Sequence, residues 1–369
     1  MRVKQWHRAL GLGLALFWLV QAASGAAIEL VWWLDSVSYH DVEAPPRPQV
    51  LAHGLETLRA EGASVGSVWS AGTVASQAKF FYSDRQGQYR VRRIDSAGKT
   101  LYDVRTDSRL THEGFMQTIS ELHKTLLLGP NGQWLVAASG VFLVLSLVLG
   151  VQLALRGRVR LRQVLFWKPA SSPTVRRFQT HRMLGGWVVI PALALALTGA
   201  LLAWTEGLQS VRTAPAEAAS SVAAEADSPA ASDSSQAEVA GPEETGPARA
   251  IELALAALPG SRLSALILPD ATRNWYEVLV RAPGETQRFW GTTRIHVAAL
   301  GGKVERMPDD ALPALQRFSE WLYPYHTGLF GGLWMRGTAL LVGLVLLVTA
   351  VYGLLLWNAR RARPRARAS

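Results

Sequence analysis

Four of the eight histidines stand at matching positions beside long apolar runs, and they are the residues of this chain best suited to chemistry. His7 and His181 each precede an arginine at the start of an apolar run. His123 and His326 each lie before another apolar run, and a short segment that contains glycine separates each histidine from its run. Because an imidazole nitrogen is a common metal ligand, histidines that recur in pairs predict a shared iron at each pair.

The apolar runs indicate four membrane-spanning helices. Each run lacks lysine and arginine for about 20 residues or more, which is long enough to cross a bilayer core of about 30 Å. They cover residues 9–34, 134–155, 183–204 and 337–357. A cleaved signal peptide is the alternative for the first run, but that run is longer than the apolar part of a signal peptide. Glu29 lies near its outer end, where it is interpreted as facing headgroups, with a buried functional carboxylate as the alternative.

The runs are also related in pairs. Residues 6–25 and 180–199 both contain His-Arg-x-Leu-Gly and both close with a small hydroxyl residue and glycine. The runs that follow His123 and His326 carry glycines at equal offsets from those histidines. The sequence therefore predicts two tandem units of helix, outer domain and helix, packed around a shared axis.

The positive charge lies on one side of the predicted helices. The formal net charge is +10, and bases concentrate in the first eight residues, in residues 156–182 and in the tail. This positive-inside pattern predicts that both termini and the middle loop lie in the cytoplasm, and it argues against nucleic-acid binding. The absence of cysteine excludes disulfides, iron-sulfur clusters and covalently attached haem.

The predicted fold class is an α-helical membrane protein whose two repeats each enclose a small α+β periplasmic domain. Alternating strands after a short helix, closed by turns such as Asp95-Ser-Ala-Gly-Lys99, predict these domains. The segments expected are membrane helix 1 (1–34), outer domain 1 (35–112), a surface helix with membrane helix 2 (113–155), a basic cytoplasmic loop (156–182), membrane helix 3 (183–206), a disordered acidic insertion (207–248), outer domain 2 (249–310), a surface helix with membrane helix 4 (311–357) and a basic cytoplasmic tail (358–369).

One histidine pair at each membrane face suits two haem groups, each with two imidazole ligands. His7 and His181 would bind the inner haem, and His123 and His326 the outer one. Cations near the headgroups could bind the haem propionates; the candidates are Arg8 and Arg182 inside and Lys124 and Arg336 outside. For any of these histidines taken singly, the alternative is an interfacial residue with its ring at headgroup level. Their recurrence between the two units favours ligation.

The chain resembles the PepSY-associated transmembrane family, often called iron-regulated membrane proteins, over nearly its whole length apart from the acidic insertion. The matching motifs are W-H-R-x-L-G, its copy H-R-x-L-G with a closing T-G, L-H-K-T-L-L-L-G and Y-H-T-G-x-F-G-G. The outer domains look like PepSY modules, although the second lacks the usual turn aspartate at 298–301. The resemblance implies a protein of the bacterial inner membrane that is a haem-b oxidoreductase of the ferric-siderophore reductase type, with His7, His181, His123 and His326 as axial ligands.

Two classes of function remain open at this point. The first is an enzyme that carries electrons between two non-covalent b haems and reduces ferric siderophores in the periplasm. The second is a non-enzymatic, membrane-anchored PepSY protein that binds a peptide, a protease or an uptake component. A siderophore transporter lacks support because the runs contain few polar residues at mid-depth. No flavin, nicotinamide or phosphate-binding motif identifies an electron donor. The remaining histidines, His40, His53, His112 and His296, do not recur and are interpreted as surface residues.

Overall fold

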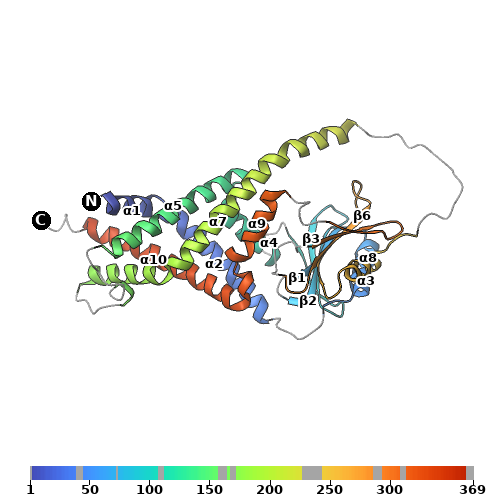
Figure 1. Ribbon diagram of the computed structural model, residues 1–369, viewed down its shortest axis with the longest axis horizontal. Coiled ribbons are helices and arrows are strands. Elements are labelled where there is room, and N and C mark those ends of the chain that lie inside the picture. The colour runs from blue at the N-terminus through green and yellow to red at the C-terminus, as the bar shows by residue number, and fades with distance from the viewer. Residues whose placement is uncertain are drawn as a thin grey trace. The chain divides into compact units, whose positions relative to one another are not determined.

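The computed structural model of the chain divides into two compact units (Figure 1). The membrane unit contains Met1–Trp33, Thr118–Gly207 and Leu322–Ser369, and the sheet unit contains Leu34–Gln117 and Leu208–Trp321. The residues described are 2–38, 45–71, 74–106, 112–156, 164–166, 172–226, 243–285, 293–307 and 313–362. Most of the predicted basic tail and parts of the predicted basic loop and acidic insertion lie outside the described residues.

The membrane unit is built from helices. Those that belong to it wholly or in part are α1 (Arg2–Gly13), α2 (Ala15–Ser38), α4 (His112–Thr125), α5 (Pro130–Ala154), α7 (Pro173–Ala226), α9 (Ala314–His326), the 3-10 helix η2 (Leu329–Gly331) and α10 (Gly332–Ala362). Four of them are long and apolar enough to cross a membrane, with spans at Ala15–Leu34, Pro130–Ala154, Pro173–Gln209 and Leu329–Ala359. The four predicted spans are therefore confirmed as helices of sufficient length and composition.

The spans keep large apolar side chains on their outside. Leu16 is 76% exposed, Ile190 79% and Leu341 59%. Such a surface would be unstable in water over this length, whereas lipid tails solvate it. Small residues fill the inside instead, and Ala192 is completely buried between Val188 and Val342.

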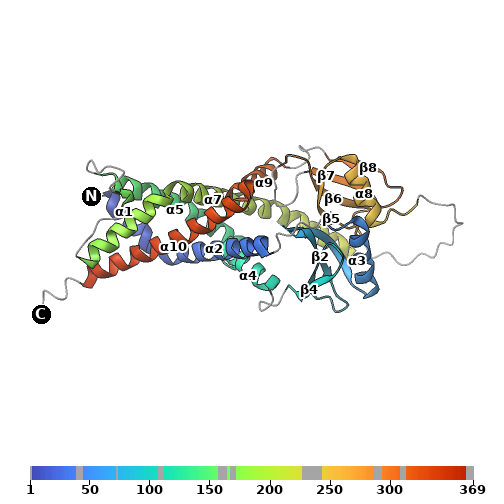
Figure 2. The ribbon, with the colours of Figure 1, turned by 90° about the horizontal axis from the view of Figure 1, so that it is seen from below.

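Glycines let the spans approach one another closely. A Cβ atom added to Gly140 on α5 would lie 2.8 Å from the Cβ of Ala200 on α7. A Cβ atom on Gly343 of α10 would lie 3.4 Å from the Cβ of Ala26 on α2. The four spans run side by side in both views of the molecule (Figures 1 and 2). In lipid there is no hydrophobic driving force between helices, so close van der Waals packing at small residues stabilises these crossings instead.

Two helix boundaries differ from expectation. The first predicted helix, 1–34, is divided into α1 and α2 at Leu14, although the Leu14 amide still donates to the Leu10 carbonyl at 3.0 Å. The predicted disordered insertion begins at 207, whereas α7 continues to Ala226. Residues 214–226 are rich in alanine and glutamate, which favour a helix more than the polar composition alone suggested.

The sheet unit contains eight antiparallel strands in the order β4-β3-β2-β1-β5-β6-β7-β8. The strands are β1 (Ser64–Ala71), β2 (Val74–Ser83), β3 (Tyr89–Ile94), β4 (Thr100–Arg105), β5 (Arg262–Ile267), β6 (Trp275–Arg281), β7 (Thr293–Ala298) and β8 (Val304–Arg306). Four strands lie in each of the two segments in which alternation predicted an α+β domain. Their turns use glycine where the chain reverses, for example at Gly98, whose φ is +89°.

The two predicted outer domains are not separate bodies, because their strands join in one sheet. β1 pairs with β5 through Ser67↔Ile267, Val68↔Leu266 and Trp69↔Ala265. Without this pairing, β1 and β5 would each be an edge strand with unpaired backbone amides and carbonyls. The pairing removes both edges. The segments predicted as outer domains, 35–112 and 249–310, therefore contribute to one unit with a common sheet.

Two helices cover the same face of this sheet (Figures 1 and 2). They are α3 (Pro48–Ala60) and α8 (Pro247–Ala257), and each has proline in its first turn, where no backbone donor is lost. Leu55 and Leu58 of α3 and Ile251 of α8 are buried in one core that includes residues from both halves of the sheet. The shared core explains why the two halves form one unit.

Candidate functional site

The structure brings the four recurring histidines together as two pairs in the membrane unit. The ring centroids of His7 on α1 and His181 on α7 are 6.4 Å apart, with an interplanar angle of 59°. Those of His123 on α4 and His326 at the end of α9 are 6.3 Å apart, with an interplanar angle of 28°. A metal–imidazole bond of about 2 Å, plus about 1 Å from the ligating nitrogen to its ring centre, gives about 6 Å between two rings on opposite sides of one metal ion.

Backbone carbonyls fix the orientation of the rings in the first pair. The Nδ1 atom of His7 lies 3.0 Å from the carbonyl oxygen of Ser146 on α5. The Nδ1 atom of His181 lies 2.8 Å from the carbonyl oxygen of Thr349 on α10. Since a carbonyl can only accept, Nδ1 carries the proton in both rings and Nε2 keeps its lone pair. This is the tautomer that ligates a metal through Nε2.

His326 is held in the same way from α7. Its Nδ1 atom donates to the carbonyl of Leu195 at 3.1 Å and lies 3.2 Å from the Thr198 hydroxyl. Thr198 donates its own proton to the Ala194 carbonyl at 2.7 Å, which turns the lone pairs of its oxygen towards the imidazole. The hydroxyl residue that recurs in the sequence therefore orients a histidine.

His123 has the corresponding partners on α2. Its ring is hydrogen-bonded to the backbone of Gln21, and its Nδ1 atom lies 3.1 Å from the Ser24 hydroxyl. Ser24 donates to the Val20 carbonyl at 2.7 Å, as Thr198 does to its own helix. Each histidine is thus oriented by a helix from its own half of the chain, while its neighbouring imidazole comes from the other half.

The two pairs lie well apart along the bundle. His181 is on α7, and the same helix contacts His326 through residues 195–199. These positions are 14 to 18 residues apart in one helix, which corresponds to about 20–27 Å. The pairs therefore occupy different depths of the unit.

Burial keeps these imidazoles neutral. It lowers the pKa of His123 to about 4, with a further contribution from the neighbouring His326. It also lowers the pKa of His7 and of His326 below the ordinary value of 6.5. A neutral imidazole is the form that binds a metal, so near neutral pH no proton has to leave before ligation.

Two glycines are in contact with the rings of the second pair. A Cβ atom on Gly25 would lie 2.9 Å from the Cε1 atom of His123, and one on Gly199 would lie 2.7 Å from the Cε1 atom of His326. At the first pair the corresponding distances are longer, 3.4 Å for Gly150 against His7 and 3.4 Å for Gly353 against His181. The second pair therefore requires glycine, whereas the first has room for a methyl group.

The donor set fits a haem with two imidazole ligands. Besides the neutral rings, the Gln21 side chain has a buried Nε2 atom that no described residue accepts from. Gln21 is the residue whose backbone is hydrogen-bonded to His123, so this amide lies near the second pair. A carboxylate of a bound group is the kind of acceptor that such a donor needs.

The predicted propionate-binding cations have varied surroundings. Arg336 is 5% exposed and lies 5.3 Å over the ring of Trp32, with the charge of Glu29 nearby. Arg182 lies 5.8 Å over the ring of Phe178, at the end of the unit that carries the first pair. The charge of Arg336 is thus already partly matched by a carboxylate of the chain.

The two other cations, Lys124 and Arg8, are both exposed. Lys124 follows His123 directly, and its charge acts on Glu206 of α7. Arg8 follows His7 in α1.

Glu29 is buried, as in the alternative interpretation of the sequence, and does not face headgroups. It was expected to face headgroups, but it is only 9% exposed. Its position one helical turn after Gly25 was the available signal, since Gly25 belongs to the recurring pattern. What the pattern could not reveal is the neighbouring helix that covers it.

The non-recurring histidines form no comparable arrangement. Among the described residues, no group of three or more His, Cys, Asp or Glu side chains could hold a metal ion. His53 is exposed on α3, and His296 stacks on Trp275 at 5.3 Å in the sheet unit. His40 and the side chain of His112 lie outside the described part of the chain.

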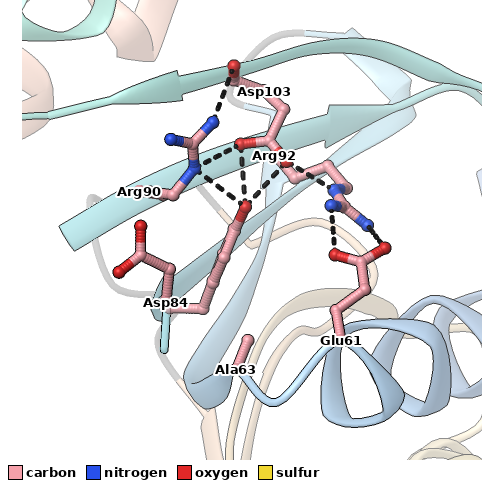
Figure 3. Close-up of a pocket in the computed structure, with 7 residues that line it drawn as sticks. Glu61, Ala63, Asp84, Arg90, Arg92 and Asp103 are labelled. Atoms are coloured by element: carbon pink, nitrogen blue, oxygen red, sulfur yellow. Dashed lines mark hydrogen bonds and ion pairs between the residues drawn. The ribbon is translucent and has the colours of Figure 1, made fainter. Parts of the chain in front are cut away.

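The sheet unit contains a polar pocket that the sequence did not reveal (Figure 3). Its volume is about 230 Å³, and it is lined by Glu61, Ala63, Tyr82, Asp84, Arg90, Arg92 and Asp103. Asp103 accepts from the Tyr82 hydroxyl at 2.7 Å, from Arg90 at 3.0 Å and from Arg92 at 2.8 Å. Arg92 also binds Glu61 with both terminal nitrogens. These charges satisfy one another, so the cluster stabilises β2, β3 and β4.

Replacing Asp103 with asparagine is expected to destabilise the sheet unit by about 2 kcal/mol at neutral pH, because two arginines lose their shared carboxylate. Burial acts to raise the pKa of Asp103, but hydrogen bonds from Tyr82, Arg92 and Arg90 outweigh it and lower the pKa below 3.8. The stabilisation is therefore complete above that value and is lost as the pH falls through the lower pKa of the folded state. Thermal unfolding of both proteins across this acid range measures the difference, and equal stability at neutral pH would contradict it.

A protein-family model matches most of the chain. The family model described as the PepSY-associated TM region matches residues 4–360, a range that includes all four histidines of the two pairs. No curated protein matches the chain. Together with the four apolar helices and the antiparallel sheet, the match makes the chain a multi-pass membrane protein with a PepSY-like unit.

Proposed function

We propose, from the premise that the chain belongs to the PepSY-associated TM region family, that it is a haem-b oxidoreductase of the bacterial inner membrane. In this proposal the protein carries electrons from the cytoplasmic side or the membrane pool to ferric siderophores in the periplasm. The electron donor is a partner that this chain contains no motif to identify. We also propose that the chain consists of two tandem repeats and that both of its termini lie in the cytoplasm.

One observation carries the proposal. Two histidine pairs, 6.4 Å and 6.3 Å between ring centroids, would each hold one iron between their imidazoles. Three of the four Nδ1 atoms lie within 3.1 Å of a backbone carbonyl, and the fourth ring is hydrogen-bonded to the backbone of Gln21. An interfacial histidine needs neither the pairing nor the fixed tautomer. Metal-ligating histidines usually have both a fixed tautomer and a second hydrogen bond.

The chain's residues would divide the work of holding two haems. His7 and His181 would ligate the iron near the cytoplasmic face, and His123 and His326 the iron near the periplasmic face. When bound, each haem supplies an iron that alternates between the ferric and ferrous states. The apolar spans exclude water from that iron, and the propionates would be bound by cations such as Arg182 or by the Gln21 amide.

The distribution of basic residues supports the proposed orientation. The basic segments near residues 1–8, 156–182 and 358–369 would lie in the cytoplasm, so the His123–His326 pair would lie towards the periplasm. Each electron that arrives there would reduce one Fe(III) to Fe(II). Hard oxygen donors of a siderophore hold Fe(II) far less tightly, so reduction would release the metal.

The proposal predicts two haem equivalents per chain. The protein purified in mild detergent should show a Soret band and, after chemical reduction, the sharp visible bands of a low-spin b haem. The reduced protein should then be reoxidised under anaerobic conditions by a ferric hydroxamate siderophore, with one Fe(II) trapped by a chelator for each electron lost. A purified protein without a Soret band would contradict haem binding, and a haem protein that ferric siderophores do not reoxidise would contradict the substrate.

A further inference from the structure

A carboxylate is buried in the membrane unit close to the His123–His326 pair. Glu29 is on α2, one helical turn after Gly25, and a Cβ atom on Gly25 would touch the His123 ring. Its side chain is 9% exposed, and its Oε2 atom has no hydrogen-bond partner among the described residues. A charge inside a membrane span is costly, so such residues usually have a functional reason.

Two further groups surround Glu29 from other helices. Arg336 on α10 is 5% exposed and its charge acts on Glu29. Tyr323 lies on α9, three residues before His326, and it is close enough for the charge of Glu29 to act on it. Burial raises the pKa of Tyr323, and Glu29 adds to this effect, so the phenol keeps its proton. Glu29 thus lies one turn from the glycine that contacts His123, and Tyr323 lies one turn from His326 on another helix.

Three other charged groups lie in this part of the membrane unit, namely Glu206, Glu121 and Lys124. Glu206 on α7 acts weakly on Tyr323, and it is itself influenced by Lys124 and Glu121 on α4. Glu121 and Lys124 are exposed, so Glu206 shares its surroundings with groups in contact with solvent. Glu29 has instead one buried base, which also lies over the ring of Trp32.

The fold itself does not require an acid at this position. Glu29 follows His7 by 22 residues, and the residue that follows His181 by 22 is Ala203. Ala203 is buried with 7% exposure, so an alanine satisfies the packing at the corresponding place on α7. The carboxylate on α2 is therefore an addition to one half of the chain only.

We propose that Glu29 takes up a proton when the centre held by His123 and His326 is reduced. One electron arrives at that centre, one proton from water on the same side binds the Glu29 carboxylate, and both leave when the electron passes to the ferric substrate. The added negative charge of the electron would otherwise remain uncompensated in a medium of low dielectric constant. Arg336 and Tyr323 position the carboxylate. This inference rests on the proposed haem function.

The test is a redox titration of the purified wild-type protein between about pH 6 and about pH 8. The outer component is identified as the one missing from His326→Ala. Its midpoint potential should fall by up to about 59 mV per pH unit, the value for one proton per electron. In Glu29→Gln, which preserves the shape of the side chain, this slope should disappear. The matched control is Glu206→Gln, which should keep the slope.

Three results would overturn the inference: a potential independent of pH in the wild type, a slope that persists in Glu29→Gln, or a slope lost in Glu206→Gln instead. If Glu29→Gln does not assemble, the infrared difference spectrum of the wild type decides. Reduction should then produce a carboxylic acid carbonyl band that shifts with isotope-labelled glutamate, and its absence would refute the assignment. A protein without haem would contradict the proposed function itself, whereas a haem protein with a flat potential contradicts this inference alone.

Discussion

Alanine at position 326 is expected to remove one of the two haem equivalents and leave the other. His326 and His123 are paired at 6.3 Å, so loss of one ring would leave the other to hold the outer haem alone. The haem content of the purified variant should fall from about two to about one per chain, because the His7–His181 site lies about 20 Å or more away.

Because two histidines would hold each haem, combinations of variants test the prediction further. His123→Ala should remove the same haem as His326→Ala, and the double variant should lose no more than either single one. Combining His326→Ala with His7→Ala should instead remove both haems. His53→Ala, at an exposed position on α3, is the control and should retain both. Equal losses from all single variants, or an additive loss within the pair, would contradict the arrangement by pairs.

Alanine at position 199 is expected to disrupt the outer haem site although it adds only a methyl group. The new Cβ would lie 2.7 Å from the Cε1 atom of His326, well inside contact distance, so the ring must move. Gly353→Ala is the matched control, because its Cβ would lie 3.4 Å from the Cε1 atom of His181. In both cases alanine favours the helix over glycine by about 1 kcal/mol, so a loss at 199 cannot be a helix-propensity effect.

The measurement is the haem content and the visible spectrum of both variants. Gly199→Ala should lose most of the component that is absent from His326→Ala, or show an altered axial ligation at that site. Gly353→Ala should keep the wild-type spectrum. Gly25→Ala, with a Cβ at 2.9 Å from His123, should behave like Gly199→Ala. Similar behaviour of Gly199→Ala and Gly353→Ala would show that the close contact at the second pair does not control the ring position.

The sequence by itself determined much of what these variants test. Apolar runs without lysine or arginine identify the four spans, because a helix needs a fixed minimum length to cross a bilayer. Alternation of apolar residues predicts strands in both outer segments, because side chains in a strand point to opposite faces. The recurrence of histidine, glycine and a hydroxyl residue at equal offsets identifies the four imidazoles and their grouping into pairs. These signals are local or periodic, and they need no knowledge of how the helices pack.

Only the tertiary structure decided which groups meet between elements. The pairing of β1 with β5 joins two expected domains into one sheet, and no local pattern distinguishes an edge strand that stays free from one that finds a partner. Arg336 was expected to bind a propionate and Glu29 to face headgroups, yet the two residues lie near each other inside the unit. They are more than 300 residues apart in the chain. The periodicity of a helix indicates which of its faces is buried, but it does not indicate which other helix packs against that face. The contacts between different helices come from packing, which is why the buried carboxylate and its partners became visible only in three dimensions.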